Sequence, residues 1–179
     1  VADVTASIDI DEDPLGHEIM GFGASVTESC LENLKKLSPQ QKQKVMESFF
    51  DSQKGAGLNF LRLPIGSNDF SLGDYTLNDV NDDKLPPEEK IKKMNYKKIE
   101  PLLDFVIEAR KINPNIKLMM SPWTPPAWMK DTKKLKGGQL KKEYYKYYAQ
   151  YLAQTADYIN KYINKNQKEA SRNPLVSMT

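Results

Sequence analysis

Short apolar runs alternate with longer amphipathic segments along this 179-residue chain, and that alternation restricts its fold more than any other feature. The apolar runs lie at residues 19–25, 58–65, 116–120 and 175–178. The run at 58–65 is interrupted only by Asn59 and Arg62, as expected for a strand covered on both faces. Strands that alternate with helices are typical of parallel βαβ units with right-handed crossovers. The sequence therefore predicts an α/β fold with a parallel sheet.

Three helical regions separate the apolar runs. The first covers residues 28–50, where Ser38, Pro39 and Gln41 have the spacing of an N-cap, an N1 proline and a capping-box partner. We expect glycines 55 and 57 to end it. The second covers residues 99–107 and is stopped by Pro114. The third covers residues 140–162 and carries tyrosines at helical spacing, which we interpret as packing of the helix onto the sheet rather than as a stacking surface.

Two long segments without an apolar period decide between an open sheet and a closed barrel. Residues 66–96 follow the second strand and residues 124–138 follow the third. Barrels build their active sites from loops at this end of the strands. The glycines at 21 and 23 lack the third glycine of a dinucleotide fingerprint. We therefore predict the first half of a (β/α)₈ TIM barrel, because a full barrel takes about 250 residues.

The predicted domain organisation has two parts. Residues 19–179 form the first four strands and three helices of the incomplete barrel, and residues 1–18 form a separate N-terminal segment. No stretch of about 18 consecutive apolar residues occurs, so no transmembrane segment is expected. The net charge of +2 is too small to indicate nucleic acid as a partner.

The scarcity of cysteine and histidine narrows the chemistry. Cys30 is the only cysteine and His17 the only histidine. An intrachain disulfide, a thiolate cluster and a zinc site with several histidines are therefore excluded. Any chemistry must therefore rest on carboxylates, hydroxyls or lysines.

Candidate functional residues lie just past the predicted strands. Arg62 stands inside an apolar strand, where its charge calls for a carboxylate partner, and Asp69 follows that strand. Asp69 has two open interpretations: a ligand at the site, or the cap of a turn. Among the prolines that follow the third strand, we interpret Trp123 as an exposed platform for a sugar ring and Trp128 as a core residue. Glu28, at the start of a helix, is interpreted as a partner of the helix dipole rather than as a catalytic group.

Five ordered segments resemble glycoside hydrolase family 30, which includes the glucosylceramidases. They are Gly-Phe-Gly-Ala-Ser-Val-Thr-Glu from Gly21, Gly-Leu-Asn-Phe-Leu-Arg-Leu-Pro-Ile from Gly57, Asn-Asp-Phe-Ser from Asn68, Tyr-Thr from Tyr75, and Ser-Pro-Trp-Thr-Pro-Pro-Ala-Trp-Met-Lys from Ser121. The resemblance implies a (β/α)₈ barrel beside a small β-sandwich, with residues 1–18 lending a strand to the sandwich. It also implies hydrolysis of β-glycosides with retention, without a metal or cofactor.

The same resemblance assigns roles to individual residues. Asp69, Trp123, Arg62 and Phe70 correspond to the substrate-binding site, for a β-linked glycoside or glycolipid of the glucosylceramidase or β-1,6-glucanase kind. The family's acid/base glutamate lies in an Asn-Glu-Pro motif after the fourth strand, and its nucleophile follows the seventh. No Asn-Glu-Pro occurs in this sequence, so we expect no catalytic residue here, a remaining C-terminal half of the barrel as partner, and an inactive chain.

Three functions remain open at this point. The first is the N-terminal half of a retaining β-glycosidase, and the second is a carbohydrate-binding half-barrel without catalysis. The third is a phosphate-handling barrel, which is disfavoured because the usual phosphate site lies in the other half of such barrels. The resemblance favours a secreted, periplasmic or lysosomal location.

Overall fold

A four-stranded parallel sheet organises the chain, whose computed structural model describes residues 6, 8, 16–167 and 175–178. Its strands are β1 (Gly23–Ser25), β2 (Phe60–Ile65), β3 (Lys117–Pro122) and β4 (Leu175–Met178), and they lie side by side in chain order. Each strand pairs in parallel with the next. An order without reversal matches the first strands of a barrel, whereas a doubly wound sheet reverses its order at a switch point. The predicted half-barrel is confirmed.

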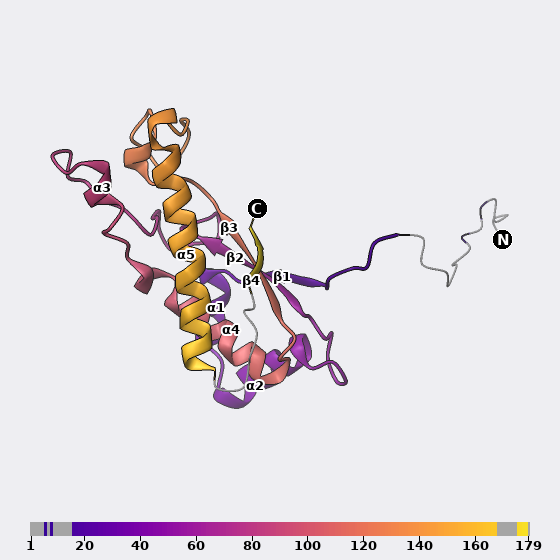
Figure 1. Ribbon diagram of the computed structural model, residues 1–179. Helices are drawn as coiled ribbons and strands as arrows, with labels where there is room; N and C mark the ends of the chain where they lie inside the picture. Colours follow the sequence, from indigo (N-terminus) through magenta and orange to yellow (C-terminus); the bar gives the residue numbers. More distant parts are fainter. Residues whose placement is uncertain (1–5, 7, 9–15, 168–174, 179) are drawn as a thin grey trace.

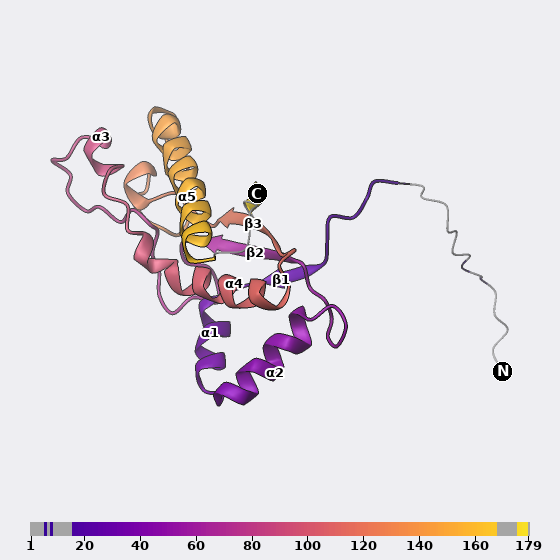
Figure 2. The same ribbon diagram turned by 60° about the horizontal axis from the view of Figure 1, so that its bottom comes forward.

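The helices gather on one side of this sheet (Figures 1 and 2). They are α1 (Glu28–Lys35), α2 (Pro39–Phe50), the single-turn α3 (Pro87–Lys90), α4 (Glu100–Ile112) and α5 (Tyr145–Asn166). Helix α4 contacts α1, α2 and α5, and therefore forms the centre of the helical layer. Most of the predicted segment 1–18 lies outside the described residues, so its place in a β-sandwich stays a prediction.

Alternation along β2 and β3 places the core between the sheet and the helices. Leu61, Leu63 and Leu118 are at most 2% exposed and face the helical layer, where Leu103 and Val106 of α4 are fully buried. On the opposite face, side chains at 60, 62, 117 and 119 are only half-buried. This second face corresponds to the inside of a barrel, and the same alternation turns Arg62 toward it.

One predicted boundary was wrong, for a local reason. The first strand begins at Gly23 instead of residue 19, because the Phe22 carbonyl accepts N–H groups of both Asn59 and Phe60 and so leaves the regular ladder. Helix α2 ends at Phe50, as predicted, but Asp51 is its C-cap and the glycines at 55 and 57 lie beyond that end. There the Asp51 carboxylate accepts two backbone N–H groups and folds the chain into a turn. The predicted capping box of Ser38 and Gln41 is confirmed.

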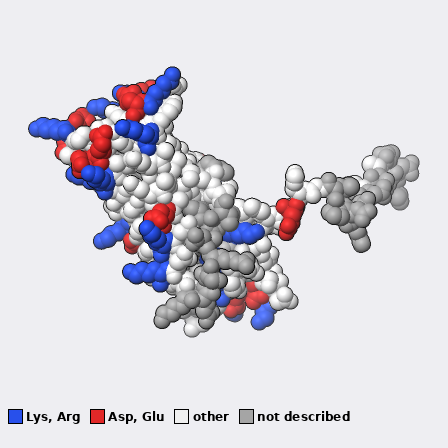
Figure 3. Space-filling view, viewed as in Figure 1, with Lys and Arg blue, Asp and Glu red and all other residues white. Residues whose placement is uncertain are grey.

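The tyrosines of α5 pack as predicted. Tyr147 and Tyr151 are buried, and Tyr158 and Tyr162 donate hydrogen bonds to Glu100 and Asp104 of α4. Figure 3 shows lysine and acidic side chains intermingled near α3 and the start of α5. No helix among the described residues is long and apolar enough to cross a bilayer.

The exposed outer strand β1 generates a prediction about self-association. β1 is exposed over its whole length, and the Phe22 side chain beside it is 70% exposed. Such an edge offers unpaired backbone groups to a second molecule. We expect sedimentation velocity to show association that increases with concentration, and Phe22→Lys to reduce it. A wild-type chain that stays monomeric and melts in one sharp transition would contradict this.

Candidate functional site

The candidate site lies where β2 and β3 end, because the carboxyl ends of neighbouring parallel strands meet at one edge of the sheet. Two loops leave that edge. We call residues 66–76 the β2 loop and residues 123–140 the β3 loop. A cleft of about 530 Å³ lies between them, lined by residues 67–69 and 71–74 of the β2 loop and by Trp123, Thr124, Leu135 and Lys136 of the β3 loop.

Two hydrogen bonds between Ser67 and Tyr75 close the β2 loop at its base. The Ser67 N–H donates to the Tyr75 carbonyl at 2.9 Å, and the Tyr75 N–H donates to the Ser67 hydroxyl at 3.0 Å. Gly66 makes this closure possible with a φ of +84°, and a Cβ there would lie 3.0 Å from the Tyr75 carbonyl oxygen. The loop therefore starts and ends at fixed points.

Asn68, and not Asp69, caps the turn inside this loop. Its side-chain oxygen accepts the Phe70 N–H at 2.7 Å, while its own N–H donates to the Ser71 hydroxyl at 3.0 Å. The Asp69 side chain is exposed and lines the cleft, and none of the described residues bonds to its carboxylate. The turn-capping interpretation of Asp69 is thus wrong, and its oxygens are available to a ligand.

Trp123 faces the same cleft from the β3 loop. Its indole is 46% exposed, although it follows directly on a buried strand and is flanked by Pro122 and Pro125. Its backbone N–H donates to the Ile65 carbonyl at 3.4 Å, which ties this position to the end of β2. An indole held in this way presents a flat apolar face beside a carboxylate.

Arg62 lies next to Trp123 but does not meet the carboxylate that the sequence led us to expect. Its Nη2 donates to the Ser121 hydroxyl at 2.7 Å, and its guanidinium carbon lies 5.6 Å from the centre of the Trp123 ring. It forms no ion pair with any described acidic residue. Register explains the pairing, because Arg62 lies opposite Met119 and beside Ser121 on the inner face. Ser121 carried no signal in the sequence that linked it to Arg62.

Phe70 does not line the cleft. Its ring is 64% exposed, and its carbonyl accepts both the N–H and the hydroxyl of Ser29 in α1, at 3.1 and 2.7 Å. The structure therefore brings together Asp69 and Trp123, places Arg62 beside them, and leaves Phe70 outside the cleft. Its role in binding stays a prediction.

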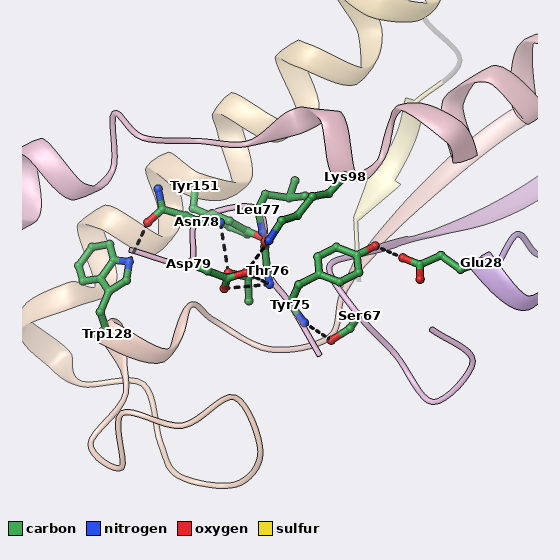
Figure 4. Close-up of polar contacts among 10 residues, drawn as sticks. All are labelled: Glu28, Ser67, Tyr75, Thr76, Leu77, Asn78, Asp79, Lys98, Trp128 and Tyr151. Atoms are coloured by element: carbon green, nitrogen blue, oxygen red, sulfur yellow. Dashed lines mark hydrogen bonds and ion pairs between the residues drawn. The ribbon is translucent and has the colours of Figure 1, made fainter. Parts of the chain in front are cut away.

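A polar network that is buried at Thr76, Asn78 and Trp128 follows the β2 loop (Figure 4). The Trp128 indole N–H donates to the Asn78 side chain at 2.7 Å, and Asn78 donates in turn to the Lys90 carbonyl at 2.8 Å. Asp79 accepts the N–H and hydroxyl of Thr76 and pairs with Lys98 at 2.7 Å. The prediction that Trp128 is a core residue is confirmed, since only 8% of it is exposed.

Lys130 holds the β3 loop from within, a role that sequence reasoning missed. Its ammonium donates to the Thr124 hydroxyl at 3.0 Å and to the Leu135 carbonyl at 2.8 Å, and the residue is 4% exposed. Burial lowers the pKa of this lysine from its ordinary value, against the opposing effect of Asp131. The loop thus closes around an internal cation.

Glu28 also has a role that the sequence did not reveal. Thr27 caps α1, and the Glu28 carboxylate accepts hydrogen bonds from the Leu72 N–H at 2.8 Å and from the Tyr75 hydroxyl (Figure 4). Burial and this carboxylate together raise the pKa of the Tyr75 phenol, so the phenol stays protonated and donates. Glu28 therefore joins α1 to the β2 loop.

Among the described residues, no group of three acidic, cysteine or histidine side chains could hold a metal ion.

Comparison with known proteins agrees with this architecture. A sequence model described as the glycosyl hydrolase family 30 TIM-barrel domain matches residues 19–173. Putative glucosylceramidase 1 of Caenorhabditis elegans is 34% identical over 152 residues, covering 82% of this chain and 28% of that protein. The chain thus spans little more than a quarter of that relative.

Two solved structures are similar as well. SrfJ from Salmonella typhimurium superposes with a TM-score of 0.73 at 30% identity, covering 82% of this chain and 32% of its own. The endo-beta1,6-glucanase BT3312 superposes with a TM-score of 0.67 at 31% identity, covering 79% of this chain and 32% of its own.

The contrast between the two tryptophans generates a prediction about stability. Trp128→Phe removes the indole donor and leaves the buried Asn78 oxygen unpaired, which costs about 1–3 kcal/mol of the free energy of unfolding. Each kcal/mol lowers the Tm by about 2–4 °C in a chain of this size. Trp123→Phe is the matched control and should leave the Tm nearly unchanged. Equal shifts in thermal melts of the two variants would contradict the assignment.

Proposed function

The chain belongs to glycosyl hydrolase family 30, and from that premise we propose that it forms the substrate-binding N-terminal half of the barrel of a retaining β-glycoside hydrolase. The single observation that carries the proposal is the position of Asp69 and Trp123. A carboxylate without a partner among the described residues and an exposed indole line one cleft, at the end of the sheet where barrels bind substrate.

This pair suits a sugar ring because each member meets a different side of it. An ionised carboxylate accepts hydrogen bonds from two hydroxyl groups at once, and the apolar C–H face of a pyranose lies flat on an indole. Arg62 donates to Ser121 and lies beside the Trp123 ring, where its remaining N–H groups could donate to the sugar. We propose Asp69, Trp123 and Arg62 as the substrate-binding residues, with Phe70 at the outer margin.

The similar proteins indicate the class of glycoside. One is named a putative glucosylceramidase and another an endo-beta1,6-glucanase, and both names denote hydrolysis of a β-linked glucoside. We therefore propose a β-glucoside as the substrate, either a glycolipid or a β-1,6-linked glucan. The remaining strands of the barrel, with both glutamates, would come from a C-terminal half.

The proposal predicts that this chain alone hydrolyses no glycoside. A retaining mechanism needs an acid/base and a nucleophile about 5–5.5 Å apart. The motif that holds the family's acid/base glutamate, Asn-Glu-Pro, is absent from the sequence. Purified chain incubated with an aryl β-glucoside should release no more aglycone than a heat-inactivated blank. Clear turnover would contradict the proposal and would make Glu28 or Asp69 a candidate catalytic group.

In an enzyme that carries these residues together with both glutamates, Asp69→Ala should reduce the stabilisation of the transition state. Charge-assisted hydrogen bonds are worth about 1.5–3 kcal/mol each, so loss of two should lower kcat/KM by about 10²-fold or more. Trp123→Ala should cost a comparable factor. Asp83→Ala is the control for charge, because Asp83 does not line the cleft and pairs with Lys133. Near-normal kcat/KM in Asp69→Ala would show that the sugar site lies elsewhere.

A further inference from the structure

We propose that Glu28 is a positioning residue for the sugar site, one that holds the β2 loop so that Asp69 faces the cleft. The inference rests on the proposed function, because it names what orients the carboxylate of that site. It does not make Glu28 a catalytic residue, since its carboxylate faces the loop.

The contacts between α1 and the β2 loop form a clamp on the turn that carries Asp69 and on the residues that follow it. After the turn, Glu28 accepts hydrogen bonds from the Leu72 N–H, at 2.8 Å, and from the Tyr75 hydroxyl. At the turn itself, the N–H and hydroxyl of Ser29 both donate to the Phe70 carbonyl. Two adjacent residues at the start of α1 therefore fix three points of the loop.

The clamp matters because Asp69 has no anchor of its own. No described residue bonds to its carboxylate, and the side chain is exposed. The direction of its Cα–Cβ bond is consequently set by the backbone of the turn, which Asn68 caps and α1 contacts. When the protein orients its binding carboxylate beforehand, less conformational entropy is lost on ligand binding.

The chemistry of Glu28 suits this role better than a neutral side chain would. Its two oxygens accept from two different donors, whereas a glutamine offers one acceptor oxygen to the same pair. The Tyr75 phenol remains a donor, because burial and the carboxylate raise its pKa. The Tyr75 ring is also held on its other side, where the Lys98 ammonium lies 5.0 Å from the ring centre. Tyr75 is thereby fixed at the end of the loop.

The variants that test the proposal separate the clamp from general stability. Glu28→Ala removes both acceptors, Glu28→Gln keeps one, and Tyr75→Phe removes only the hydroxyl donor. Glu32→Ala is the matched control, because it removes a carboxylate from the same helix whose partner is the exposed Lys35. Each variant is compared with wild type in the full 179-residue chain, at a concentration low enough to limit association.

Hydrogen exchange gives the first readout. Glu28→Ala should speed exchange in peptides covering residues 70–75 by about tenfold or more, the factor expected when one charge-assisted bond is lost. Peptides from α4 and the Glu32→Ala variant should exchange as in wild type. Unchanged exchange at residues 70–75 in Glu28→Ala would overturn the proposal.

Sugar binding gives the second readout, measured as quenching of Trp123 fluorescence by methyl β-D-glucoside. Glu28→Ala should weaken binding by about tenfold, with Glu28→Gln intermediate. If Glu28 acts through Asp69, the same substitution should have little further effect in an Asp69→Asn background. An equal loss in both backgrounds would mean that Glu28 acts independently of Asp69, which overturns the positioning role.

The two readouts distinguish failure of this inference from failure of the proposed function. If the wild-type chain and Asp69→Asn respond identically to the glucoside, the proposed site is wrong and Glu28 positions no sugar ligand. If the wild type binds the glucoside and Glu28→Ala binds it equally well with a loosened loop, the proposed function stands and the positioning role of Glu28 is overturned.

Discussion

Parallel pairing of β2 with β3 is the constraint on which the rest of the structure depends. Six consecutive residue pairs, from Phe60 opposite Lys117 to Ile65 opposite Pro122, keep the two strands in register without a bulge. Side chains alternate between faces, so this register decides at once which residues form the core and which face inward. It brings both strand ends to one edge, and therefore brings Asp69 and Trp123 to one cleft although 54 positions separate them in the sequence.

In both loops at that edge, hydrogen bonds hold the backbone while side chains that line the cleft stay exposed. The β2 loop is closed by Ser67 and Tyr75, and the β3 loop is filled by the Lys130 ammonium. Both loops are thus tied down through backbone groups and buried donors, while the side chains of Asp69 and Trp123 stay exposed. Loops on a rigid scaffold commonly carry binding residues. Here hydrogen bonds inside the loops hold them in place.

Local sequence signals predicted much of this structure, and long-range pairing explains what they missed. The capping box at Ser38 and the burial of Trp128 could be predicted because the residues next to each of them in the sequence carry the signal. The exposed position of Trp123 followed from the prolines around it. The hydrogen bonds from Arg62 to Ser121 and from Tyr75 to Glu28 could not be predicted, because they join residues 59 and 47 positions apart. No periodicity records such a pair, which exists only once strand register is fixed.

The pairing of carboxylates around the two loops adds a last argument for the location of the site. Asp79 is satisfied by Thr76 and Lys98, and Asp74 pairs with Lys136 across the mouth of the cleft at 3.1 Å. Asp131 accepts backbone N–H groups, which lower its pKa, and Glu28 is occupied by Leu72 and Tyr75. Each of these acidic groups has an internal partner that accounts for its presence. Asp69 has none among the described residues, and it lines the cleft together with the exposed Trp123. Its carboxylate is thus the one of this group that remains open to a ligand, and the hydroxyl groups of a sugar would suit both its charge and the flat ring next to it, as the proposed function requires.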